Sequence, residues 1–151
     1  MSQRRKIVNY IIDNLKLIDG SISSLNSTYR FKTDLHTNVY RGFKGIDEIN
    51  DFPSIYVVAG NETRNYNTKN ITLSNLPIII RVYTYFEEEE LVNTYNGNII
   101  QDIEHVIYNL PSNFDLEIQD IQIQTINSDE GLLAPYGIVE VQLQASYEVR
   151  L

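Results

Sequence analysis

The 151-residue chain contains no cysteine, which excludes disulfide bonds, thiolate metal sites and cysteine nucleophiles. Histidine is nearly as scarce, with two in the whole sequence, so the inventory for acid–base or metal chemistry is short. The sequence also lacks a G-x-S-x-G elbow, a P-loop and a G-x-G-x-x-G fingerprint. Enzyme hypotheses therefore have no starting residue, and we expect a protein that is not an enzyme and needs no cofactor.

Long apolar runs are absent as well. No stretch approaches the roughly 20 apolar residues that cross a bilayer. The start, MSQRRKIVNYIIDNLKL, has a basic pair followed by apolar residues, but Asp13, Asn14 and Lys16 interrupt the apolar run, so a secretion signal is not supported. We therefore expect a soluble protein with no membrane partner.

Basic residues are the minority among the charges. Acids outnumber bases 20 to 12, which gives a formal charge of -8 and a pI near 4.7. Such a balance repels nucleic acid rather than attracting it. The length is that of one domain with an ordinary hydrophobic core, so we expect residues 1–151 to form a single domain.

Two segments have the periodicity of helices that bury one face. Ser2 is a suitable N-cap for the first segment, and Gly20 supplies a stop signal after it. The second segment follows the acidic run Glu87–Glu90, which favours a helix start, and Pro111 ends it. The apolar residues at helical spacing are Ile7, Val8, Ile11, Ile12, Leu15 and Ile18 in the first, and Ile99, Ile100, Ile103, Val106, Ile107 and Leu110 in the second.

Several other segments have the texture of strands. They are YRFKT, NVYRGF, PSIYVVAG, LPIIIRVYTYF and GIVEVQLQASYEVRL. LPIIIRVYTYF carries bulk on both faces, so we expect a central strand covered on both sides. The last segment alternates apolar and polar residues from Val139 to Leu151, which predicts one buried face. Its length suggests a strand that extends past its own core and pairs with a neighbouring subunit.

The segment LEIQDIQIQTI contains a break in its alternation. Its apolar positions slip by one residue, which predicts a β-bulge near Gln119 and Asp120. The order of elements is helix, strands, helix, strands, without regular β-α-β alternation. The sequence therefore predicts an α+β fold, a mostly antiparallel sheet with two helices packed on it.

The segment NETRNYNTKN, Asn61 to Asn70, contains no aliphatic residue and predicts a solvated loop between two strands. Arg64 and Lys69 could contact phosphate there, and Tyr66 could stack on a base. Two cations in a chain of this charge more often mark an ordinary solvated loop, which is the interpretation we favour.

The segment SDEGLLAPYG, residues 128–137, places apolar side chains where a loop is expected. Leu132, Leu133, Pro135 and Tyr136 either tuck under the final strand or contact another subunit. The sequence favours neither alternative strongly.

Asp102 and His105 lie three residues apart on the second predicted helix and share a face, as a metal-binding pair would. With Glu104 they could serve a small metal- or ligand-binding domain. That face lies opposite the apolar stripe and no further histidine accompanies it, so we expect a solvated helix surface and no metal. His36 has no identifiable partner.

The order and texture of the chain resemble those of a known family. The resemblance rests on the N-terminal helix, on VYRGFKGIDEINDFPSIYVVAGNETR, on IIIRVYTYFEEEE leading into the second helix, and on INSDEGLLAPYGIVEVQLQASYEV. These features are similar to those of the tail terminator (tail completion) proteins of long-tailed bacteriophages. A neck or head-completion protein of similar size shares the texture and stays an alternative.

The resemblance implies a structural subunit of the virion that assembles in the host cytoplasm. Such a subunit forms a ring of six copies at the head-proximal end of the tail tube, stops tube polymerisation and presents the surface that joins the head. Its implied partners are copies of itself, the tail tube protein, the neck or head-completion proteins and, in a contractile tail, the sheath. The contact surfaces would be loops and strand edges, here 61–70 and 128–137. Independently of the resemblance, the charge of -8 per copy predicts a lumen that repels DNA and lets it pass without specific binding.

Overall fold

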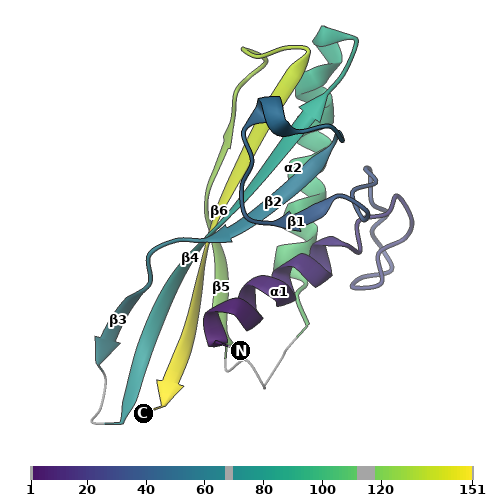
Figure 1. Ribbon diagram of the computed structural model, residues 1–151. Helices are drawn as coiled ribbons and strands as arrows, with labels where there is room; N and C mark the ends of the chain where they lie inside the picture. The colour runs from purple at the N-terminus through teal and green to yellow at the C-terminus, as the bar shows by residue number, and fades with distance from the viewer. Residues whose placement is uncertain (1, 67–69, 112–117, 151) are drawn as a thin grey trace.

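The computed structural model describes residues 2–66, 70–111 and 118–150. Two helices, α1 (Gln3–Leu15) and α2 (Val92–Tyr108), pack on one face of a six-stranded sheet (Figure 1). Two short 3₁₀ turns, η1 (Ile46–Glu48) and η2 (Glu89–Leu91), lie in the connections. The predicted α+β class is confirmed.

The sheet is antiparallel except at one edge. Its order is β1 (Val39–Arg41), β2 (Ser54–Ala59), β4 (Ile71–Tyr85), β6 (Tyr136–Arg150) and β5 (Ile118–Ser128). Only the pair of β1 and β2 is parallel among the described strands. The sixth strand, β3 (Thr63–Tyr66), also pairs with β4.

Helix α1 begins as the sequence predicts but ends earlier. The Ser2 Oγ accepts a hydrogen bond from the Arg5 backbone nitrogen at 3.2 Å, which confirms the N-cap. The helix ends at Leu15, because the next amides bond three residues back, Leu17 to Asn14 and Ile18 to Leu15. Gly20 lies beyond the helix in a turn with φ of +80°.

The core lies between the helices and one face of the sheet. Ile78, Ile80 and Val82 of β4 are fully buried there with Val139 and Val141 of β6. Each such side chain contributes about 1.5–3 kcal/mol when buried completely. The final strand has the single buried face that its alternation predicts.

The opposite face of β4 is covered only in part, so the prediction of a strand covered on both sides is wrong. Ile79 and Arg81 are half-buried on that face. Further along the strand, Tyr83 is buried beside Tyr56, because the η1 segment packs over both of them. The cover therefore comes from a connection rather than from a second layer of helices.

One strand and one loop are predicted wrongly from the sequence. YRFKT forms no strand, and its Arg30 makes a single isolated bridge to Ile22. Conversely, the predicted loop 61–70 contains β3. Strand β2 ends at Ala59 while β4 runs on to Ile71, which leaves an unpaired edge of β4 that β3 occupies through Thr72–Asn75.

Strand β5 carries the predicted bulge. Its register against β6 shifts between Ile118 and Asp120, and a second shift between Ile123 and Thr125 was not predicted. Strand β6 is paired with β4 from Tyr136 to Arg150 and, on its other side, with β5 from Val139 to Tyr147. Along residues 139–147 the free edge on this side therefore belongs to β5, and pairing of β6 with a neighbouring subunit stays a prediction.

Candidate assembly surface

The turn between β5 and β6 is held in one conformation by Asp129. Its Oδ2 accepts a hydrogen bond from the Leu133 nitrogen at 3.1 Å, and its Oδ1 accepts one from the Ile138 nitrogen at 3.3 Å. Glu130 and Gly131 have φ of 53° and 81°, the left-handed region that reverses the chain. A carboxylate that binds two backbone amides makes this a fixed turn.

This turn displays its apolar side chains to solvent. Leu132 is 88% exposed, Leu133 is 45% exposed and Tyr136 is 39% exposed, while Pro135 is half-buried. The alternative in which the two leucines tuck under the final strand is therefore wrong. A leucine that is almost fully exposed on a fixed turn is a suitable contact for another protein.

Tyr136 also belongs to an aromatic cluster. Its ring centroid lies 5.1 Å from that of Tyr85 and 5.6 Å from that of Phe52. The three residues meet because β4 ends where the antiparallel strands β2 and β6 begin. Phe52, Tyr85, Leu132, Leu133 and Tyr136 are called the end surface below.

Sequence reasoning missed Phe52 and Tyr85. Tyr85 is 41% exposed and lies opposite Tyr136 in the register of β4 with β6. The signal that could have identified it is its position at the end of a strand with an aromatic residue on the outer face. The strand register needed to use that signal is a tertiary property.

Exposed acids border the end surface. Glu87, Glu88, Glu89, Glu90 and Glu130 are all exposed and are called the acidic rim. The Phe86 nitrogen donates to the Pro135 carbonyl at 2.9 Å, which joins the glutamate run to the turn. The η2 turn, which contains the last two glutamates of the run, separates the run from α2. The first turn of α2 itself contains no acidic residue.

The other predicted contact segment lies at the far end of β4. Arg64 donates to the Glu62 carboxylate at 2.9 Å, and the Tyr147 hydroxyl donates to the same carboxylate. Burial alone raises the pKa of Glu62, but these hydrogen bonds outweigh it and the pKa lies below its ordinary value. Tyr66 ends β3, and Lys69 lies outside the described residues. Arg64 and the end surface are not brought together.

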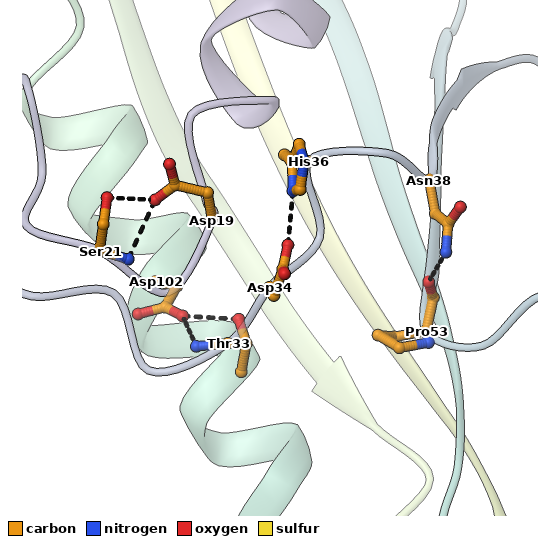
Figure 2. A network of polar contacts seen from close by, with 8 residues as sticks. All are labelled: Asp19, Ser21, Thr33, Asp34, His36, Asn38, Pro53 and Asp102. Carbon is orange, nitrogen blue, oxygen red and sulfur yellow. Dashed lines mark hydrogen bonds and ion pairs between the residues drawn. The ribbon is translucent and has the colours of Figure 1, made fainter.

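Asp102 is fully buried, so the predicted solvated helix surface is wrong at this position. Its carboxylate accepts hydrogen bonds from the Tyr29 hydroxyl at 2.6 Å and from the Lys32 and Thr33 nitrogens at 3.0 and 2.8 Å. The Thr33 hydroxyl donates a further bond at 2.6 Å (Figure 2). Asp102 therefore fastens the irregular segment 17–38 to α2.

His105 of α2 contacts the segment 17–38, and His36 lies within it. The ring of His105 stacks on Tyr29 with centroids 4.0 Å apart, and its Nε2 lies 2.7 Å from the Ser23 Oγ. His36 does have a partner, because its Nδ1 lies 2.5 Å from the Asp34 Oδ1 (Figure 2). Within residues 2–66, 70–111 and 118–150, no group of three or more potential ligands could hold a metal ion.

A structural role fits this arrangement better than a catalytic one. The polar network around Asp102 holds a segment in place, and the end surface exposes apolar side chains. In the described part of the chain, neither helix is long and apolar enough to span a membrane. The fold and the end surface are thus those expected of a structural subunit.

Comparison with known proteins identifies the kind of subunit. The family model described as Bacteriophage Tail Tube Terminator Protein matches residues 1–150, and the chain belongs to this family of structural phage tail proteins. It is 29% identical over 162 residues to Tail tube terminator protein p142 of Escherichia phage T5, covering 98% of this chain and 95% of that protein. The resemblance in the sequence is thereby confirmed.

A solved structure was also matched. A chain of the structure titled "Virion of native gene transfer agent (GTA) particle" superimposes with a TM-score of 0.49 and 14% identity, covering 76% of this chain and 81% of that one.

Proposed function

We propose that six copies of this protein form a ring on the head-proximal end of the tail tube, where the ring stops tube polymerisation and forms the surface that joins the head. The observation that carries the proposal is the end surface, with Leu132 88% exposed on a fixed turn in a chain of the terminator family. Covering such side chains with other subunits removes apolar area from water.

Ring closure needs a heterologous interface, in which one patch meets a different patch on the next copy. The end surface is one half of that interface. The tail tube protein, the neck or head-completion proteins and, in a contractile tail, the sheath would contact the remaining faces. The protein then resides in the virion after assembly in the host cytoplasm.

The net charge suits a channel for DNA. With a formal charge of -8 per copy, a lumen lined by part of this charge repels the phosphate backbone, so DNA slides through without adhering. A ring whose lumen is lined mainly by lysine and arginine would refute this part of the proposal.

Electron microscopy of particles that lack the protein tests the role. Overlong tails are the result expected of a terminator, because nothing stops tube growth. Tails of normal length that fail to join heads would instead indicate a connector between portal and tail, and would overturn the terminator role.

The ring itself is tested on the purified protein. Size-exclusion chromatography with light scattering, before and after addition of purified tail tubes, reports whether copies assemble alone or only on the tube. A protein that stays monomeric in both conditions, with no ring at tube ends in micrographs, would contradict the proposal.

A further inference from the structure

Charge is unevenly distributed across the subunit. The acidic rim adjoins the turn between β5 and β6 and the start of α2, because the Phe86 nitrogen donates to the Pro135 carbonyl and a Cβ added at Gly131 would lie 3.5 Å from Asn93 Nδ2. Segments 86–91 and 128–136 contain no lysine or arginine. The rim therefore lies between the end of β4 and the start of α2, beside the turn between β5 and β6, and its charge is of one sign.

Helix α1 and the neighbouring β1 edge carry exposed bases. Arg5 and Asn9 of α1 and its C-cap residue Lys16 recur at spacings of four and seven residues, which places them on one face. Arg41 of β1 joins this face, because its Nη1 donates to the Asn9 Oδ1 at 3.3 Å. Arg5, Lys6, Lys16 and Arg41 are exposed and are called the basic face; Asp13 is the exposed acid on α1 beside them.

These two surfaces lie apart on the molecule. The basic face comprises α1 and the β1 edge, whereas the acidic rim follows the end of the central strand β4 and adjoins the turn between β5 and β6. Figure 1 shows α1 beside β1 and the turn between β5 and β6 at the far end of the sheet, beside the start of α2. A subunit with opposite charges on separate surfaces is suited to contact copies of itself.

From this separation we infer that the acidic rim and the leucines of the end surface dock on the basic face of a second copy. The inference rests on the proposed ring and names the second half of its heterologous contact. Leu132 and Leu133 supply apolar area, and the surrounding charges select the orientation. A contact between two acidic rims is disfavoured by repulsion between like charges.

A cross-linking experiment identifies the docking partner. Because the chain has no cysteine, the variant Glu89→Cys carries a single thiol for a photoreactive cross-linker. Isotope-labelled and unlabelled copies of the variant are mixed with purified tail tubes, and mass spectrometry locates each cross-link. A cross-linked pair of one labelled and one unlabelled peptide must come from two copies.

The expected cross-links join position 89 to residues of α1 or β1 in another copy. Cross-links to the rim of another copy, to the tail tube protein alone, or none at all would overturn the inference. Rings seen in micrographs without cross-links to α1 or β1 would remove this contact and leave the ring standing. Cross-links to α1 or β1 without any rings in micrographs would support this contact and contradict the proposed ring.

A charge exchange provides the second test. Glu88→Lys with Glu89→Lys, and separately Arg5→Glu with Lys6→Glu, should each weaken assembly at least about tenfold, and the four changes combined should restore it. Acids in the first turn of α1 suit the helix dipole, so the fold is retained. Arg30→Glu with Lys32→Glu, which alters the same net charge at exposed loop bases, should leave assembly unchanged. Assembly that the four combined changes fail to restore would count against the contact.

Discussion

Thr33 binds the carboxylate of Asp102 through both its backbone nitrogen, at 2.8 Å, and its hydroxyl, at 2.6 Å. The two residues are 69 positions apart in the sequence. Because the carboxylate is fully buried, it relies on these donors in place of water. The segment 17–38 thus depends on one side chain of α2 for its position.

Replacing Asp102 with alanine should therefore be strongly destabilising. The change leaves the Lys32 and Thr33 nitrogens without their acceptor, and we expect a loss of about 3 kcal/mol or more in the free energy of unfolding. Urea denaturation measures the loss. Gln101→Ala, at the exposed neighbouring position, should change stability by less than about 0.5 kcal/mol, and equal effects of the two variants would contradict the anchoring role.

Leu133→Asp should abolish assembly while the monomer stays folded, because Leu133 is 45% exposed and its burial in a contact would then enclose a charge. Leu132→Asp should act in the same way. Light scattering measures assembly, and thermal denaturation should show a stability change within about 0.5 kcal/mol. The matched control is Ile22→Asp, at an apolar residue 53% exposed outside the end surface. Unchanged assembly in both leucine variants would remove the turn from the interface.

Gly137→Ala should destabilise the fold because the site has no room for a methyl group. A Cβ there would lie 2.5 Å from the Thr84 Oγ1 and 2.6 Å from the Asn96 Nδ2, and both residues are buried. We expect a loss of about 1–3 kcal/mol.

Gly97→Ala is the matched control for this change. Apart from its chain neighbours and the backbone of its own helix, no atom of the described residues lies within 4 Å of a Cβ at position 97, which is in the interior of α2. Alanine should therefore stabilise the helix by about 0.5–1 kcal/mol. Differential scanning calorimetry should show melting temperatures that move in opposite directions, and shifts of the same sign would contradict the packing at Gly137.

Protonation of His105 should lower the stability of the wild-type protein as the pH drops below about 6.5. Burial lowers the pKa of His105 below its ordinary value, although the charge of Asp102 opposes the shift. The unfolded chain therefore takes up a proton more readily, so the stability that this group contributes is complete above about pH 6.5 and is lost as the pH falls through the folded-state pKa.

Urea denaturation of the wild type and of His105→Gln between about pH 5 and about pH 7 checks this expectation. The variant should have the flatter profile, because glutamine does not titrate. Carboxylates such as Glu62, whose pKa is also lowered, remain in both proteins and provide the common background. Parallel profiles would show that His105 contributes nothing to the pH dependence.

Local patterns in the sequence predicted the elements whose signals lie within a few residues. The N-cap at Ser2, the alternation of β6 and the bulge beside Gln119 were all predicted from such patterns. The class of fold followed from the order of these elements. The end of α1 and the strand β3 did not follow, because the first is set by the 3₁₀ bonds of the next turn and the second by an open edge of β4.

By itself, the sequence determined that this protein has no cysteine and only two histidines, an α+β architecture and apolar residues in an expected loop. Periodicity and composition carry that information, because they reflect which side chains avoid water. Only the tertiary structure decided that Leu132 and Leu133 are displayed, that Phe52 and Tyr85 join Tyr136, and that Asp102 is an internal anchor. The burial of a side chain depends on which distant segments pack together, and that packing is set by the strand register and the order of the strands in the sheet.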